Sequence, residues 1–165
     1  MKIARMFAAA KDTGGDLLLY LYDEIGESFW SQGITAKAIA QEIENAAKPT
    51  SITLRINSPG GDVFEGLAIM NLIRSQGVPV TVMVDGLAAS AASIIAMAGD
   101  RIVMADNALL MIHNAWSVAV GDAAEMRKTA DLLDKVSGTL RDTYARRSGQ
   151  SADAVASMMD LGAPR

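Results

Sequence analysis

The 165-residue chain has no cysteine and only one histidine, His113. Without cysteine the chain cannot form a disulfide framework, a thiolate zinc site or a cysteine nucleophile. A single histidine also leaves little for a metal site. The lack of cysteine and the scarcity of histidine thus argue against disulfide-stabilised folds, cysteine catalysis and most metal sites.

The chain also lacks a block of basic residues and a long apolar run. It carries 19 acidic and 15 basic residues, for a net charge of −4, which argues against a nucleic-acid partner. The uncharged run Gly86 to Gly99 has 14 residues, whereas a membrane span needs ~20. Charged residues among Met1 to Ala10 do not fit a signal peptide. We therefore predict a soluble, cytoplasmic protein without a membrane partner.

What the chain does have is apolar residues, at 50% of the sequence, which is enough for the core of one globular domain over residues 1–165. Strand-like and helix-like segments alternate along it, after a weakly patterned lead-in over 1–15. This alternation predicts an α/β fold of stacked βαβ units with a mainly parallel sheet. Thr35 is the expected N-cap of the first helix. The predicted strands cover 16–23, 51–57, 78–84, 101–105 and 109–113, and the predicted helices cover 36–47, 64–75, 91–98 and 122–147.

One serine stands where a strand turns into a helix. The apolar run Val80 to Val84 is interrupted by Asp85-Gly86, and small residues then surround Ser90. Such a turn can expose a serine at a helix start, where free backbone N–H groups favour a developing negative charge. Ser90 is therefore a candidate nucleophile. We expect Ser93, one helical turn later, to face the core.

A second loop, Ser58-Pro59-Gly60-Gly61, follows the strand before it. In an open parallel sheet, ligands bind beyond the carboxyl ends of the strands, so both loops should reach the same crevice. Consecutive glycines allow close approach of a backbone and can aim an amide N–H into a site. Two such amides directed at one oxygen form an oxyanion hole, which is a large term in acyl transfer.

Each of these features has an ordinary structural explanation when it is taken alone. Pro-Gly-Gly is typical of a tight turn, a serine before a helix is typical of an N-cap, and one histidine in an apolar run is typical of a core residue. Their combination in one chain favours catalysis, because a serine nucleophile needs a base and His113 is the only histidine.

Three segments in this order resemble the signatures of the Clp protease proteolytic subunit family: INSPGGDVFEGLAIMNLI, DGLAASAASIIAMAGD and NALLMIHNAW. The resemblance covers about Leu17 to Asp160 and implies the ClpP/crotonase fold with a protruding helical handle at about 118–147. The amino-acid sequence of the second segment is similar to that of the ClpP-related head maturation (prohead) proteases of phages and prophages. The implied substrates are phage capsid or scaffold proteins, and the implied assembly is a homo-oligomer of heptameric rings.

The resemblance also implies a role for individual residues. Ser90 would be the nucleophile, His113 the general base and Asp160 the third member of a Ser-His-Asp triad. The backbone N–H groups of Gly61 and Ala91 would form the oxyanion hole. No cofactor or metal is implied. A peptide substrate would bind as an added strand along Gly60, Gly61, Asp62, Val63 and Asn114.

Two departures from the family qualify these expectations. Residues 1–15 show no match to the segment that serves an ATP-driven unfoldase, so an unfoldase partner is not implied. The family continues well beyond its catalytic aspartate, whereas this sequence stops five residues after Asp160. We therefore expect the C-terminal end of the family domain to be missing or replaced after Asp160. We expect Asp160 to be displaced or poorly held.

The function we expect is that of a serine endopeptidase of phage capsid maturation. The alternatives are a crotonase-like acyl-CoA enzyme, a ring-forming structural protein that has lost activity, and a serine–lysine peptidase using Lys128 or Lys135. The acyl-CoA alternative shares the fold and the two-amide oxyanion hole, but the chain shows no obvious coenzyme A signature.

Overall fold

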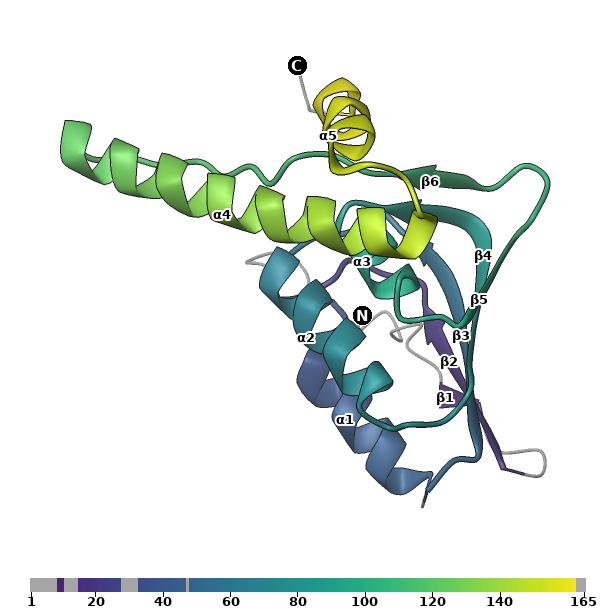
Figure 1. Ribbon diagram of the computed structural model, residues 1–165. Helices are drawn as coiled ribbons and strands as arrows, with labels where there is room; N and C mark the ends of the chain where they lie inside the picture. Colours follow the sequence, from purple (N-terminus) through teal and green to yellow (C-terminus); the bar gives the residue numbers. More distant parts are fainter. Residues whose placement is uncertain (1–8, 11–14, 28–32, 47, 163–165) are drawn as a thin grey trace. The chain divides into compact units, whose positions relative to one another are not determined.

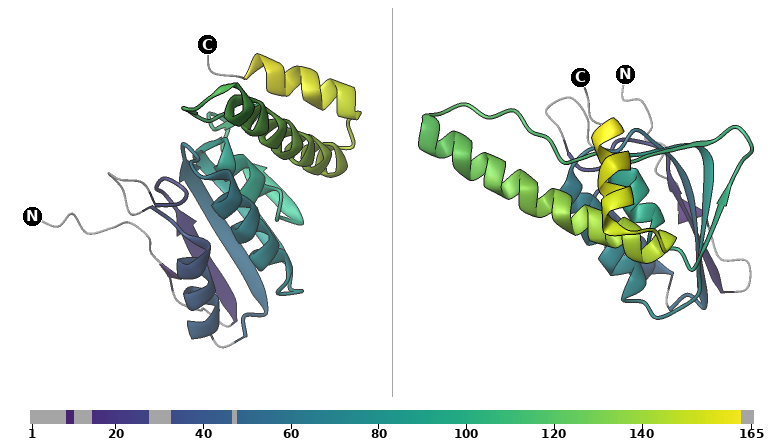
Figure 2. Two further views of the ribbon diagram at one scale, coloured as in Figure 1. Left: turned by 90° about the vertical axis from the view of Figure 1, so that its left-hand side faces the viewer. Right: turned by 45° about the horizontal axis from the view of Figure 1, so that its top comes forward.

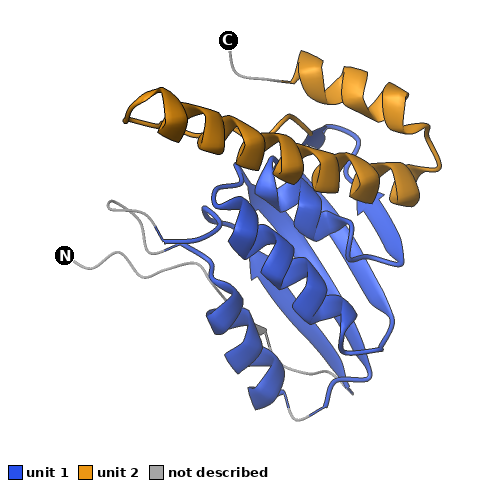
Figure 3. Ribbon diagram, turned by 60° about the vertical axis from the view of Figure 1, so that its left-hand side comes forward, with its two compact units in different colours: residues 1–111 blue, residues 112–165 orange. Residues whose placement is uncertain are grey.

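The computed structural model describes residues 9–10, 15–27, 33–46 and 48–162. The loop expected at 31–33 and the lead-in expected at 1–15 fall mostly outside the described residues. Two compact units make up the chain, residues 1–111 and residues 112–165 (Figure 3). Each unit is described by itself.

The first unit is built on a mainly parallel sheet of six strands (Figure 1). β4 is central to it and pairs in parallel with β3, β5 and β6, while β1 joins β2 in antiparallel orientation. The α/β class and the mainly parallel sheet are thus confirmed. The strands are β1 (Ala9–Ala10), β2 (Asp16–Leu21), β3 (Ser51–Ser58), β4 (Val80–Ala89), β5 (Arg101–Met104) and β6 (Leu109–Met111).

Three helices lie against one face of this sheet (Figures 1 and 2). They are α1 (Ala36–Asn45), α2 (Val63–Arg74) and α3 (Ala91–Ala96). Alternate residues of the strands point into the core that these helices cover, as the period of two in a strand requires. Thr35 caps α1 as expected, since its hydroxyl accepts a hydrogen bond from the Ala38 N–H. The fully buried strand residues include Leu19, Leu21, Ile52, Leu54, Ile56 and Val82.

Strand β4 does not end at Asp85-Gly86, contrary to the sequence-based expectation. It continues to Ala89 because Leu87, Ala88 and Ala89 pair with β6. The register with β3 shifts between Ile56 and Ser58, so Asp85-Gly86 marks an irregularity within the strand rather than its end.

The carboxylate of Asp85 has hydrogen-bond partners, which offset the cost of placing a charged residue within a strand. It accepts hydrogen bonds from Arg55 Nε at 2.9 Å and from the Tyr22 hydroxyl at 2.6 Å. The guanidinium of Arg55 lowers the pKa of Asp85, so the carboxylate stays ionised. This polar cluster secures the strand that leads to Ser90.

The second unit contains an extended segment and two helices, α4 (Ala123–Ser148) and α5 (Ala152–Leu161). The long helix predicted over 122–147 is confirmed with a shift of one residue at each end. Helix α5 was not predicted. It begins at the cap Ser151, contacts α4, and buries Val155 and Met159. None of the described helices is long and apolar enough to cross a membrane.

Candidate functional site

Ser90 lies between the end of β4 and the start of α3 in a strained backbone conformation. Its φ of 54° and ψ of −124° are unusual for a residue with a side chain. A conformation of this kind costs about 1–3 kcal/mol and persists only where the surroundings enforce it. The Ser90 N–H donates to the Met111 carbonyl at 2.9 Å, and the Ser90 carbonyl accepts from the Ser93 N–H at 2.9 Å. Backbone contacts on both sides therefore fix the turn.

The side chain of Ser90 does not act as a helix cap. It occupies the N-cap position of α3 but makes no capping hydrogen bond. The corresponding side chains of the other described helices do cap, through Thr35, Asp62, Asp122 and Ser151. The ordinary explanation for a serine before a helix thus does not account for Ser90.

The glycine loop packs directly against this turn. Gly60 has a φ of +91°, and a Cβ added there would lie 2.5 Å from the Ala89 carbonyl oxygen and 2.7 Å from the Ser90 Cβ. Ser58, which is buried, shapes the loop from within: its hydroxyl donates to the Asp23 carbonyl at 2.6 Å and accepts from the Gly60 N–H at 3.2 Å. Only glycine at position 60 permits the two loops to approach so closely.

The Gly60–Gly61 peptide group is oriented by Ile25. The Gly60 carbonyl accepts from the Ile25 N–H at 2.8 Å, and the Asp62 N–H donates to the Ile25 carbonyl at 2.8 Å. In a trans peptide the N–H points opposite to the C=O. The Gly61 N–H is therefore directed away from Ile25.

The amide of Ala91 is close to the same loop. A Cβ built on Gly60 would lie 2.9 Å from the Ala91 nitrogen. As the first residue of α3, Ala91 has no partner for its N–H within the helix. The loop and the turn thus bring the two backbone amides expected from sequence, those of Gly61 and Ala91, to one region of the first unit.

The segment expected to bind the substrate, Gly60 to Val63, runs into helix α2. Helix α2 begins at Val63, with the Asp62 carboxylate accepting from the Phe64 and Glu65 N–H groups, so Val63 is not extended. Of the candidates in this segment, Gly60, Gly61 and Asp62 precede the helix. Asp62 also lines a surface cavity of about 600 Å³ together with Phe64.

His113 belongs to the second unit and is buried, with 7% of its surface exposed. Strand β6 ends at Met111, two residues earlier than predicted. Burial lowers the pKa of His113 below its ordinary value of 6.5. The imidazole is thus neutral at pH 7, the form in which it can accept a proton.

The end of α5 packs on the backbone beside His113. A Cβ on Gly162 would collide with the Ile112 carbonyl oxygen and lie 3.3 Å from the His113 Cβ. Asp160, in the last turn of α5, accepts a hydrogen bond from Asn114 Nδ2 at 2.7 Å. Asp160 is therefore held by α5 and Asn114 and is not poorly ordered, contrary to that part of the expectation. Its hydrogen bond goes to Asn114, and its displacement from the triad position stays a prediction.

Asn114 and Asp160 also line one cavity of about 600 Å³ within the second unit. The segment that carries Asn114 is attached to α4, since the Ala115 N–H donates to the Ser137 hydroxyl at 3.1 Å. This places polar side chains from the extended segment and from α5 around a space within the second unit.

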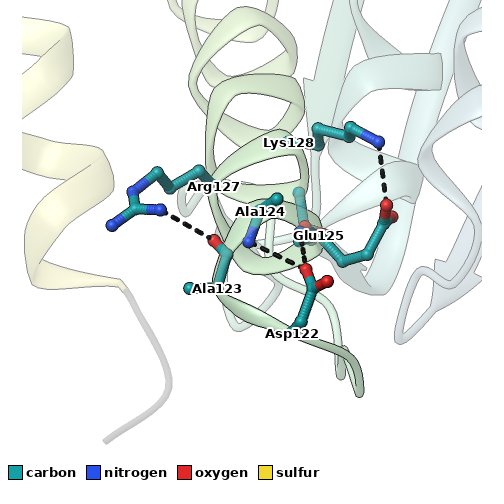
Figure 4. A network of polar contacts seen from close by, with 7 residues as sticks. Asp122, Ala123, Ala124, Glu125, Arg127 and Lys128 are labelled. Atoms are coloured by element: carbon teal, nitrogen blue, oxygen red, sulfur yellow. Dashed lines mark hydrogen bonds and ion pairs between the residues drawn. The ribbon is translucent and has the colours of Figure 1, made fainter.

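The lysines of the serine–lysine alternative are poorly suited to act as a base. Lys128 is exposed and pairs with Glu125 at 2.8 Å in the first turns of α4, next to the cap Asp122 (Figure 4). Lys135 is exposed as well. A lysine that acts as a base is desolvated, whereas both of these side chains are exposed. In the described part of the chain no group of three or more candidate ligands could hold a metal ion.

Comparison with known proteins decides the family. The family described as Clp protease matches residues 15–162. The chain belongs to the Clp protease family.

Individual members of the Clp protease family and one solved structure support this assignment. The chain is 31% identical over 142 residues to ATP-dependent Clp protease proteolytic subunit 1 of Chlamydia muridarum, covering 80% of this chain and 74% of that protein. It is 34% identical over 132 residues to the proteolytic subunit of Leuconostoc citreum, covering 73% of this chain and 64% of the relative. It is also 34% identical over 107 residues to that of Pleurastrum terricola, covering 64% of this chain and 55% of the relative. A ClpP1 point mutant of Listeria monocytogenes has the same fold, with a TM-score of 0.71 at 23% identity over 87% of this chain and 78% of that one.

Sequence reasoning about this Clp family member did not identify the residues that hold the site. Ser58, Ile25 and Met111 orient the loops through hydrogen bonds, but two of them do so with backbone atoms, which leave no signal in residue type. Ser93 is recognisable in the sequence, because it is a hydroxyl residue within an otherwise apolar predicted helix. The structure confirms that it faces the core, with 0% exposure.

We expect Gly60→Ala to destabilise the protein by at least about 2 kcal/mol, because the new methyl meets backbone atoms at a positive φ. Denaturant unfolding measures this. Gly138→Ala in α4 is the control: a Cβ there meets nothing within 4 Å, so that variant should be as stable as the parent or slightly more stable. Equal stability of the two variants would contradict the close approach of the loops.

We expect the His113 imidazole to titrate below pH 6.5 in the folded protein, because burial disfavours its charged form. NMR of the ring proton resolves this directly, since the chain has one histidine. The unfolded chain in denaturant should titrate near the ordinary value. Since the unfolded state binds the proton more readily, the free energy of unfolding should decrease as the pH falls through 6.5 towards the folded pKa. A folded pKa at or above the unfolded one would contradict the burial argument.

Proposed function

We propose that this protein is a serine endopeptidase in which Ser90 attacks the scissile carbonyl. The observation that carries the proposal is the strained Ser90 turn, which has no capping role and faces a glycine loop. Strain at a nucleophilic serine between a strand and a helix is typical of hydrolases that form acyl-enzymes. The relatives in Chlamydia muridarum and Leuconostoc citreum are named as Clp protease proteolytic subunits, which supports the same reaction.

In this mechanism the N–H groups of Gly61 and Ala91 stabilise the negative oxygen of the tetrahedral intermediate. The proximity of Gly60 to the Ala91 nitrogen supports a shared oxyanion hole. Preorganised donors of this kind contribute several kcal/mol to catalysis, with a single donor worth about 2.7–4 kcal/mol.

His113 takes the proton of the Ser90 hydroxyl and returns it to the leaving amine. The lowered pKa of His113 supports the first step, because a neutral imidazole is the base. The pairing of His113 with Ser90 is what the family resemblance implies, and it is supported by His113 being the only histidine of the sequence.

Asp160 is the third member of the proposed triad and holds His113 in the tautomer that accepts a proton. Two contacts within the second unit support this role. Asp160 bonds to Asn114, the neighbour of His113 in the chain, and Gly162 packs on the Ile112–His113 backbone. Both contacts belong to the second unit.

The peptide substrate adds as a strand beside Gly60, Gly61 and Asp62, with Asn114 on its other side. We further propose that the substrates are capsid or scaffold proteins of a phage, cleaved during prohead maturation. This finer proposal is supported by the segment DGLAASAASIIAMAGD, which is similar to the phage branch of the Clp protease family.

A fluorophosphonate probe tests the nucleophile. Ser90 Oγ should bond to phosphorus as fluoride leaves and the hydroxyl proton passes to His113. Mass spectrometry of the digested protein should find the adduct on Ser90 and none in Ser90→Ala. Ser93→Ala should still carry it. An adduct at Ser93 alone, or none at all, would contradict the proposal and favour a structural protein that lacks activity.

Two variants of Asp160 separate a triad role from a structural one. Asp160→Asn keeps an oxygen that can accept from Asn114 but removes the charge, so turnover of a peptide should fall by up to about 10⁴-fold if Asp160 orients His113. Turnover by Asp160→Ala should fall by at least as much. Near-normal turnover in Asp160→Asn with a loss in Asp160→Ala would show that Asp160 only supports Asn114.

We also propose that the handle, residues 118–147, assembles copies of this chain into the heptameric rings that the family resemblance implies. Apolar side chains remain exposed along it and the segment before it, including Trp116 at 63%, Val118 at 82% and Val120 at 96%. Exposed apolar surface on this scale marks an interaction site.

Light scattering should therefore show an oligomer at micromolar concentration. Val120→Asp should weaken it, because a charge would have to be buried in the interface. Glu44→Gln, at an exposed position on α1 outside the handle, serves as a charge-changing control. A monomeric parent protein would contradict the assembly proposal.

A further inference from the structure

Ser93 is a buried hydroxyl that the proposed mechanism does not use. None of its surface is exposed, and it lies in α3, which is otherwise composed of alanine and isoleucine. A polar group in such a place needs a hydrogen-bond partner, since burying it without one is costly. Its hydroxyl donates to the Ser90 carbonyl oxygen at 2.6 Å.

The carbonyl that Ser93 holds belongs to the Ser90–Ala91 peptide group. The N–H of that same group is the Ala91 amide, one of the two proposed oxyanion donors. Because the peptide group is planar, fixing its C=O also fixes the direction of its N–H. A hydrogen bond at the C=O end further polarises the N–H end, since chains of hydrogen bonds strengthen one another.

The other proposed donor is supported in the same way. The Gly61 amide belongs to the Gly60–Gly61 peptide group, whose carbonyl accepts from the Ile25 N–H at 2.8 Å. Each donor peptide is thus held at its carbonyl end. The difference is that Ile25 acts through its backbone, whereas Ser93 acts through a side chain that can be changed.

We propose that Ser93 is a positioning residue of the oxyanion hole, which aims and polarises the Ala91 N–H through the Ser90 carbonyl. This inference rests on the proposed function. The Ser93 and Ile94 N–H groups also reach the Ser90 carbonyl, at 2.9 Å and 3.4 Å. Removing the hydroxyl therefore leaves the carbonyl with a partner, so the fold should survive while the orientation of the peptide group loosens.

The test compares the kinetics of fluorophosphonate labelling in the parent protein and in Ser93→Ala. The maximal rate of inactivation should fall about tenfold, the usual scale for one hydrogen bond, because the transition state relies on the oxyanion hole. The probe concentration giving half-maximal rate and the Tm should stay unchanged. The maximal rate of inactivation should also fall in Ser93→Cys, because a thiol is a weaker hydrogen-bond donor than a hydroxyl.

A matched control is available in the same unit. Ser75, the exposed C-cap residue of α2, donates its hydroxyl to the Leu72 carbonyl three residues earlier at 2.7 Å, as Ser93 does to the carbonyl of Ser90. Ser75→Ala removes the same kind of bond away from the proposed site and should label at the parent rate.

The outcomes separate this inference from the proposed function. A parent protein that is not labelled at Ser90 overturns both. Labelling of the parent at Ser90, with Ser93→Ala or Ser93→Cys reacting equally fast, overturns the role of Ser93 alone. If the rate falls only in proportion to a fall in Tm in both variants, Ser93 serves packing and the inference is also wrong.

Discussion

The turn at Ser90 is the constraint on which the first unit depends. A residue with a side chain is held at a φ of 54°, and the hydrogen bonds that hold it come from two different elements. Strand β6 supplies the Met111 carbonyl, and helix α3 supplies the donors to the Ser90 carbonyl. If either contact were lost, the residue could relax to an ordinary conformation and the Ser90 side chain and the Ala91 amide would change direction together.

The sheet around this turn is arranged to maintain it. Strand β4 pairs with three strands, and its last residues, Leu87 to Ala89, are paired to β6. The Asp85 carboxylate ties the same strand to Arg55 on β3 and to Tyr22 just after β2. The glycine loop then fills the space beside Ser90 so closely that a single methyl group would not fit. Rigidity at the site is thus distributed over several strands rather than over one residue.

The sequence predicted much of this arrangement because period and motif are local properties. The alternation of strands and helices, the Thr35 cap, the long helix and the burial of Ser93 follow from patterns of a few residues. Three features did not follow. The strand through Asp85-Gly86 depends on Arg55 and Tyr22, which are distant in the chain. Helix α5 buries only Val155 and Met159, so its apolar pattern is weak and its support of the Asp160 carboxylate was not predicted. The pairing of the Ser90 N–H with Met111 uses backbone atoms alone.

We propose that the Gly61 and Ala91 amides, whose peptide groups are held at their carbonyl ends by Ile25 and Ser93, receive the negative oxygen of the reaction. A crystal structure of the fluorophosphonate adduct tests it most directly, because the phosphonyl oxygen occupies the place of the oxyanion. That oxygen should lie at about 2.7–3.1 Å from both amide nitrogens, with the Ser93 hydroxyl still bonded to the Ser90 carbonyl. An adduct on Ser90 whose phosphonyl oxygen points to solvent or to a side chain, away from both amides, would contradict the proposed oxyanion hole.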